Sequence, residues 1–128
     1  MRQSLLLSAL VLLVVLPVMA QDPVKVDSKH YKVELENNQV RVLRIHYGPH
    51  EKSVMHEHPA SVAIFLSEGD SKFTLPDGKT AVSHLKPGQV VFEAAGKHLP
   101  ENTGTKPFDV IVVELKGART TVKPATTK

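Results

Sequence analysis

The chain has 128 residues, a formal net charge of +3 and no cysteine. The absence of cysteine excludes disulfide bonds, thiolate metal sites and cysteine nucleophiles. The basic excess lies at the two ends, because residues 21–115 carry 11 basic and 13 acidic side chains, whereas residues 116–128 carry four basic ones and no acid. Aromatic residues make up 5% and tryptophan is missing, so base-stacking platforms are not expected and nucleic acid is disfavoured as a partner.

The first 20 residues have the pattern of a secretory signal peptide. Arg2 precedes an apolar run from Leu5 to Val18, and small residues stand at Val18 and Ala20. This order predicts a helical signal peptide, residues 1–20, that is cleaved after Ala20. The alternative is a membrane anchor, but the run is shorter than the ~20 apolar residues that span a bilayer. We therefore expect an exported protein, periplasmic or extracellular, with no stable membrane anchor after cleavage.

The mature chain of 108 residues has room for a single domain with one modest core. Short apolar runs with a period near two alternate with turn signals such as Pro76-Asp77-Gly78. No window of the mature chain keeps a 3.6-residue period over three turns. The pattern predicts an all-β sandwich or barrel. Its expected strands are Tyr31–Leu35, Val40–Tyr47, Ser61–Leu66, Lys72–Leu75, Thr80–Leu85, Gln89–Glu93 and Phe108–Leu115.

The parts that flank the barrel differ from it in composition. Residues 21–30 are polar and contain proline, so we expect an extended lead-in, and residues 21–39 together form an N-terminal extension or edge strand. The barrel itself is expected over residues 40–116. Residues 117–128 are rich in Thr, Lys and Pro, which predicts a flexible basic tail.

Two of the seven histidines stand in a His-x-His pattern, His56-Glu57-His58. On a strand, residues i and i+2 point to the same face and their Cα atoms lie ~6.5–7 Å apart. Two imidazoles in that arrangement can converge on one metal ion, and imidazole suits Zn, Cu, Fe and Ni. By itself the pattern is weak, because it also occurs on a solvated strand face.

The surrounding residues resemble two motifs of the cupin superfamily, whose fold is a double-stranded β-helix barrel of the jelly-roll type. The first motif fits Gly48, His56, His58 and Gly69, with a first spacer that is two residues longer. The second fits Gly88, Gly96, His98 and Asn102, with Ala94 in place of a proline and a shorter loop before the histidine. The resemblance covers about residues 40–115. It implies a small cupin barrel and a homodimer, while many chemistries share this barrel.

The chain departs from the family at the usual glutamate ligand, which falls at Val62. The resemblance then implies a divalent metal ion (Fe, Ni, Mn, Cu or Zn) held by His56, His58 and His98 without a carboxylate. Three neutral ligands leave coordination positions open, as a catalytic metal requires, and thiol dioxygenases are cupins that use a three-His iron site. The alternative is weak metal binding or none, with His56 and His58 lining a small-molecule pocket.

Other polar side chains are weaker candidates. His50 and Glu51 could rim the pocket, Asn102 could hold the loop that aims His98, and an arginine facing the barrel would suit a carboxylate ligand. Glu57 is expected in solvent. Arg41, Arg44 and His46 lie on a strand whose inward face is not assigned, and Glu93 and Glu101 could be displaced metal ligands. His30 and His84 are expected on the surface. The residues expected in the core are Phe65, Phe73, Phe92 and Phe108.

Two functions remain open. The first is an enzyme that uses the metal to act on a small organic acid or thiol, most simply a dioxygenase-like oxidoreductase, with an isomerase or decarboxylase as less favoured reactions. The second is a binding or sensing module that captures a small-molecule ligand without turning it over.

Overall fold

The computed structural model describes residues 21–117. The predicted signal peptide and most of the predicted basic tail lie outside the described residues. Among residues 21–117, no helix is long and apolar enough to cross a membrane.

The described chain is built almost entirely of β-strands, as the sequence predicts. One short helix, α1 (Pro23–Val26), precedes them. The strands are β1 (Tyr31–Glu36), β2 (Val40–Tyr47), β3 (His56–His58), β4 (Ser61–Phe65), β5 (Gly69–Thr74), β6 (Thr80–Leu85), β7 (Val90–Glu93), β8 (Gly96–Asn102) and β9 (Phe108–Leu115).

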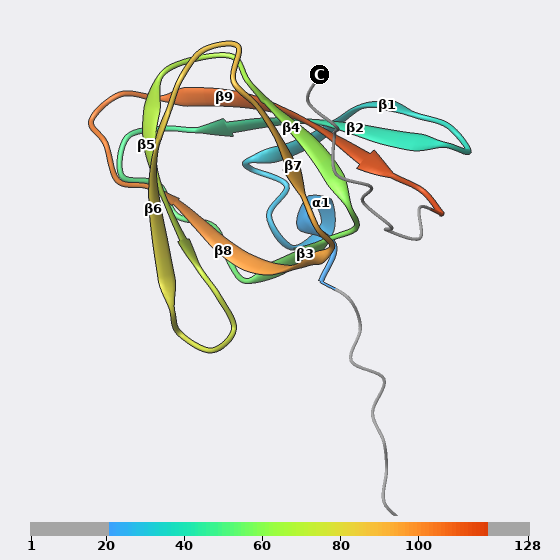
Figure 1. Cartoon of the computed structure of the whole chain (residues 1–128), viewed down its shortest axis with the longest axis horizontal. Coiled ribbons are helices and arrows are strands. Elements are labelled where there is room, and N and C mark those ends of the chain that lie inside the picture. The colour runs from blue at the N-terminus through green and yellow to red at the C-terminus, as the bar shows by residue number, and fades with distance from the viewer. Residues whose placement is uncertain (1–20, 118–128) are drawn as a thin grey trace, which may run out of the picture.

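The strands form two antiparallel sheets that face each other (Figure 1). One sheet has the order β1-β2-β9-β4-β7 and the other the order β3-β8-β5-β6. Neighbours in the sheets are often far apart in the chain, since β2 pairs with β9 and β3 pairs with β8. This arrangement confirms the predicted double-stranded β-helix barrel.

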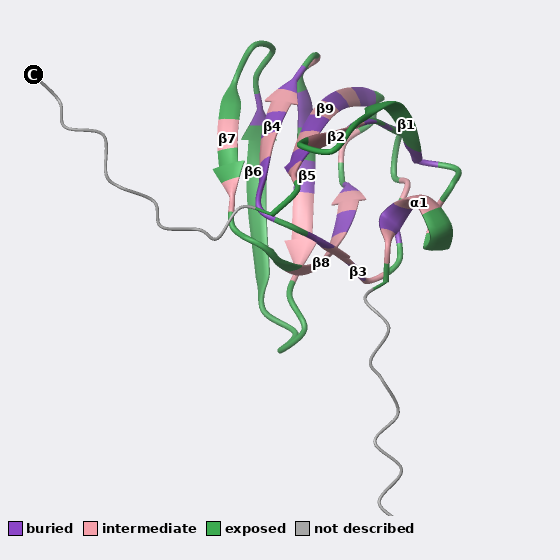
Figure 2. Ribbon diagram, turned by 90° about the vertical axis from the view of Figure 1, so that its right-hand side faces the viewer, coloured by how far each residue is buried: buried purple, intermediate pink, exposed green. Residues whose placement is uncertain are grey.

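The core lies between the sheets and is concentrated on β2, β4 and β9, while β6 and β7 are mostly exposed (Figure 2). Strand β9 shows the alternation clearly, because every second residue from Phe108 to Glu114 is buried. Phe65 and Phe108 belong to this core and Phe73 is half-buried, as expected. The prediction for Phe92 is wrong: its side chain is 44% exposed, because Val91 takes the inward position on β7.

Two segments differ from the expected secondary structure. Residues 23–26 form a helical turn rather than an extended lead-in, because the Asp22 side chain accepts the Val24 N–H and Pro23 supplies a φ suited to the first helical position. Strand β8, which carries His98, was not predicted. Gly96 and Pro100 interrupt the alternation of apolar residues there, and the strand forms through its pairing with β3 and β5.

Two of the motif glycines are needed for different structural reasons. Gly88 has a φ of +78°, which glycine adopts without the steric cost that a side chain adds. At Gly69, a Cβ atom would lie 2.6 Å from Cδ1 of Phe108, so only glycine lets these strands approach. Both glycines therefore serve the barrel and do not touch the histidines.

Candidate metal centre

The register of two strands brings three histidines together. His56 on β3 pairs directly with His98 on β8, and His58 lies two residues further along the same face of β3. One ring nitrogen from each of His56, His58 and His98 lies within 4.8 Å of the other two. The side chains of His56 and His58 are buried, and that of His98 is half-buried. The predicted convergence of these three imidazoles is present in the fold.

Hydrogen bonds fix which nitrogens of His56 and His58 face inward. Nδ1 of His56 lies 2.8 Å from the Val54 carbonyl oxygen, and Nδ1 of His58 lies 2.7 Å from Oε1 of Glu114. Both oxygens only accept, so each Nδ1 carries the proton and donates it. Each Nε2 then presents a lone pair, and the two Nε2 atoms lie 3.1 Å apart.

When both rings are neutral, no proton lies between these two Nε2 atoms to make a hydrogen bond. They are arranged as adjacent ligands of a cation, because two nitrogens that each bind a metal at about 2.1 Å stand roughly 3.0–3.4 Å apart. The His triad can therefore hold a metal ion, and the geometry selects Nε2 of His56 and His58 as ligands.

The surroundings keep the imidazoles of His56 and His98 neutral, as ligation requires. Burial, followed by the neighbouring His58, lowers the pKa of His56 to about 4. Burial, followed by His58 and His56, lowers the pKa of His98 to about 3. At neutral pH, therefore, protons do not compete with a metal for these two rings.

Glu114 belongs to the candidate centre although the sequence pattern did not predict it. It is 1% exposed and lies behind His58, where it also accepts a hydrogen bond from Nε of Arg41. Burial by itself would raise the pKa of Glu114, but the bonds from His58 and Arg41 outweigh it and lower the pKa. The signal for Glu114 is its position in the alternation of β9, where a carboxylate shares the buried face of Val110 and Val112.

Comparison with known proteins agrees with this architecture. The Cupin domain family model matches residues 43–114, more than half of the chain. The chain belongs to the cupin family. No curated protein matches the sequence.

Solved cupin structures share the fold. A cupin domain from Bordetella pertussis Tohama I has 22% identity and a TM-score of 0.64, and the match covers 68% of this chain and 92% of that one. A conserved protein with a double-stranded β-helix domain from Klebsiella pneumoniae has 29% identity and a TM-score of 0.54, with 69% and 77% covered. An RmlC-like cupin from Methanocaldococcus jannaschii has 22% identity and a TM-score of 0.55, with 70% and 84% covered.

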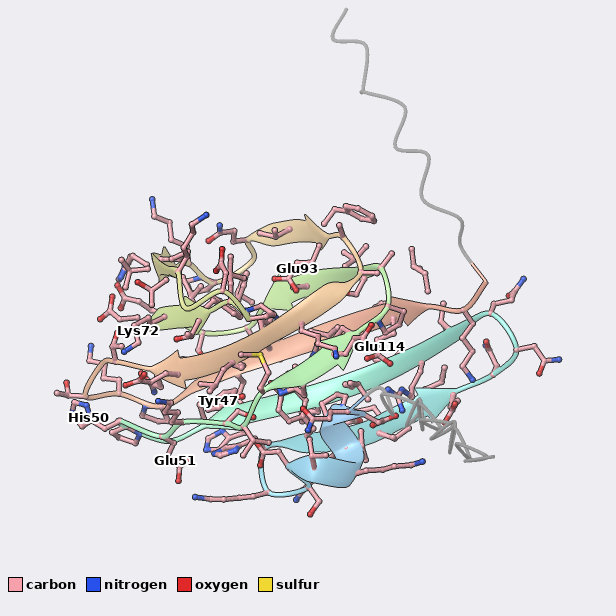
Figure 3. The ribbon with its side chains drawn as sticks, turned by 90° about the horizontal axis from the view of Figure 1, so that it is seen from below. Tyr47, His50, Glu51, Lys72, Glu93 and Glu114 are labelled. Carbon is pink, nitrogen blue, oxygen red and sulfur yellow. The ribbon has the colours of Figure 1, made fainter. Side chains whose placement is uncertain are left out.

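Val62, at the usual position of the cupin glutamate, does not line the centre. Ser61 and Ala63 are the buried positions of β4, and Val62 between them is half-buried on the opposite face. Glu93 on β7, which pairs with Ser61, is instead the carboxylate that lines the space beside His58 and His98. Figure 3 shows Glu93 and Glu114 projecting from separate strands. Burial raises the pKa of Glu93, and His58 partly offsets the rise.

The cupin barrel has an inner cavity and a mouth, and both reach the histidines. The inner cavity offers about 40 Å³ of space and is mainly apolar, with Tyr31, Tyr47 and Ser71 as polar members of its wall. The mouth has about 280 Å³. Four residues line both spaces: His58, Phe73, Glu93 and His98. A small ligand in either space would therefore meet His58 and His98.

The remaining predicted site residues lie away from this space. His50 is exposed at one end of the molecule, and Glu51 bonds Lys29, His30 and the Gly48 N–H near that end (Figure 3). Asn102 is fully buried, but its amide donates to the carbonyls of Gly48 and Lys106. It therefore holds two loops and does not contact the His98 ring directly.

The other polar residues are placed as follows. His30 was expected on the surface, but it is 6% exposed because Asp27 and Glu51 bond both of its ring nitrogens. His84 is exposed, as expected. Glu57 lies near Lys97, and Glu101 pairs with Lys72. Arg44 pairs with Glu34 and His46 with Asp109, both at the surface.

Proposed function

We propose that the protein is a metal-dependent cupin that acts on a small organic acid or thiol, most simply as a dioxygenase-like oxidoreductase. The observation that carries the proposal is the pair of Nε2 lone pairs of His56 and His58, 3.1 Å apart, with His98 as the third ligand. A divalent ion held by three neutral imidazoles keeps open positions, where it supplies Lewis-acid or redox chemistry to a bound substrate.

Glu93 is the group best placed to hold or move a proton beside the metal centre. It lines both the inner cavity and the mouth, together with His58 and His98. Because burial raises its pKa, the carboxyl is a stronger base when ionised than an exposed glutamate. We assign it the role of accepting a proton from an acidic substrate group as that group binds.

The walls of the cavity define the substrate class. Phe65, Phe73 and Phe108 give the cavity an apolar lining. The Ser71 hydroxyl is buried there and finds no hydrogen-bond partner among the described residues. Tyr31 and Tyr47 bond each other through their hydroxyls at 2.7 Å, and burial raises the pKa of both, so they stay protonated. The space suits a short molecule with an acidic head and one further polar atom.

The test begins with the metal content of the mature protein, residues 21–128, purified without a histidine tag. We expect about one equivalent of a divalent metal in the wild type and none in His56→Ala or His98→Ala. His84→Ala is the matched control, because this histidine is exposed and lies outside the centre, and it should retain the metal. Oxygen consumption with small thiols and organic acids then tests the reaction.

The second candidate is a binding module that does not need catalysis. It is favoured by the ligand set itself, because among residues 21–117 the converging group holds three histidines and no carboxylate, and a neutral set holds a divalent ion less strongly. Ligand binding that survives removal of the metal would support this candidate. Absence of metal in the wild type even after reconstitution would contradict the proposed enzyme.

Export and dimerisation remain proposals. We infer that residues 1–20 direct export to the periplasm or the exterior and that two copies associate. A row of apolar residues crosses the outer face of the five-stranded sheet from strand to strand and would let a second copy pack by two-fold symmetry. The row consists of Leu35, Val42, Val113, Val62 and Phe92. Light scattering should give the mass of a dimer for the wild type and the mass of a monomer for Phe92→Lys. Val62 and Phe92 lie outside the metal centre.

A further inference from the structure

The N-terminal segment, residues 21–31, packs directly behind the histidines. The Glu57 N–H, between the two ligands of β3, donates to the Gln21 carbonyl at 2.9 Å. At the other end of the segment, the Tyr31 ring meets the His56 ring edge-on with centroids 4.8 Å apart. The whole segment precedes residue 43, where the match to the cupin family begins.

A chain of alternating charges joins this segment to His58. Nδ1 of His58 donates to Glu114, Glu114 accepts from Arg41, and Nη1 of Arg41 donates to Asp22 at 2.7 Å. Asp22 in turn caps α1 through the Val24 N–H at 2.9 Å. Asp22 and Arg41 both lie outside residues 43–114, and Glu114 is the last residue of the matched region.

A second connection reaches His56. The Ser53 hydroxyl lies 3.4 Å from Nδ1 of His56 and donates to Asp27. Asp27 also accepts from Nδ1 of His30 at 2.7 Å. Ser53 and His30 are buried, and the Asp27 side chain is 9% exposed. Residues 21–31 thus connect to the outer side of His58 through Asp22, and they border the outer side of His56 through Asp27 and Ser53, while the Val54 carbonyl accepts the His56 Nδ1 proton.

We propose that residues 21–31 are a positioning segment of the metal centre, acting on His58 through Asp22, Arg41 and Glu114. The proposal rests on the metal binding proposed above. Arg41 balances the buried charge of Glu114, and Asp22 orients Arg41. Glu114 then fixes the tautomer and ring angle of His58 and makes its Nε2 a better ligand, as partners behind metal-bound histidines do.

The first experiment compares two arginines of β2. Arg41 and Arg44 both pair with a glutamate, but the Arg44–Glu34 pair is exposed and Arg44 lies on the opposite face of β2 from Arg41. In the mature protein, Co²⁺ titration followed by visible absorption should show an affinity loss of about 10- to 100-fold for Arg41→Gln. Asp22→Asn should give a smaller loss in the same direction, Arg41→Lys should recover part of the affinity, and Arg44→Gln should match the wild type.

The second readout needs no metal. Long-range ¹H–¹⁵N spectra of the metal-free protein report the tautomer of each imidazole, and the wild type should show His58 protonated at Nδ1. Arg41→Gln and Asp22→Asn should change the His58 signals, whereas Arg44→Gln should not. If Arg41→Gln does not fold, Asp22→Asn decides, because it leaves the Arg41–Glu114 pair in place.

The two readouts separate this proposal from the proposed function. If the wild type binds no Co²⁺ but the His58 signals change in Asp22→Asn and Arg41→Gln, the proposed metal binding is contradicted and the positioning role of residues 21–31 is supported. A wild type that binds Co²⁺, with equal affinity and equal His58 signals in Asp22→Asn, Arg41→Gln and Arg44→Gln, would overturn the positioning segment and leave the metal centre intact.

Discussion

His58 and His98 belong to one candidate metal centre but have opposite surroundings. Behind His58 stands a buried polar chain that begins with Glu114 and Arg41. Among the described residues, the His98 ring has no hydrogen-bond partner and packs against the rings of His56, His58 and Phe73. One side of the centre is thus held by charged hydrogen bonds. The other, here the apolar side because its ring is held by packing, borders the mouth, where Glu93 also lies.

This difference indicates that the two sides of the centre have different roles. A ring held through a carboxylate keeps its angle with or without a metal, which preserves the site in the empty protein. A ring held only by packing can adjust when a ligand enters the adjoining space. The polar side therefore sets the position of the metal, and the apolar side adapts to what binds.

The largest expected effect comes from removing the polar partner. Glu114→Ala leaves His58 without its acceptor and Arg41 without its main counter-charge in a buried place, so we expect a loss of about 3–5 kcal/mol in the free energy of unfolding. Urea unfolding of the metal-free protein measures it. Glu34→Ala removes the partner of exposed Arg44 and should change stability by less than about 1 kcal/mol. Equal losses in the two variants would contradict the expected difference between the buried Glu114 and the exposed Glu34.

Metal binding should stabilise the folded state by mass action. With Zn²⁺ at a hundredfold excess over its Kd, the free energy of unfolding should rise by about 2.7 kcal/mol, provided that only the folded state binds. Chelation should reverse the gain, which is measured by urea unfolding with and without the ion. His98→Ala should show no gain, since it removes a ligand. A full gain in that variant would place the ion elsewhere.

Acidification should destabilise the metal-free protein. The folded pKa values of His56 and His98, about 4 and 3, lie below the ordinary value near 6.5, so the unfolded state binds more protons as the pH falls below about 6.5. The free energy of unfolding should then fall with decreasing pH, by up to about 1.4 kcal/mol per pH unit for each proton difference. Urea unfolding between about pH 6.5 and 5 measures this slope before carboxylates contribute.

The same series sharpens the contrast between the two sides. His98→Phe removes one of the two depressed histidines, so the slope should drop by about half. Stability that stays flat over this pH range in the wild type would show that the imidazoles are not held neutral.

The smallest effect is expected on the apolar side. His98→Phe replaces a ring that has only packing contacts with an apolar ring of similar shape, so stability of the metal-free protein should change by no more than about 1 kcal/mol. Thermal unfolding in chelator measures this change. A loss as large as that of Glu114→Ala would mean that both sides of the centre are held alike.

Local patterns predicted much of the architecture. The strands Val40–Tyr47, Thr80–Leu85 and Phe108–Leu115 have the predicted bounds, because alternation and turn residues are local signals. Strand β8 was missed because its residues are polar or interrupted and gain their order from two partner strands. His30 was misplaced for a similar reason, since its burial depends on Asp27 and on the distant Glu51.

The sequence by itself determined the all-β class, the resemblance to cupins and the three histidines. These are properties of residue type and spacing, which the chain carries before it folds. Only the tertiary structure decided that Nε2 of His56 and His58 faces the centre, that Val62 faces away and that Glu93 and Glu114 supply the carboxylates. Those facts depend on strand register and on partners up to 56 residues apart, as His58 and Glu114 are, and no local pattern encodes such distances.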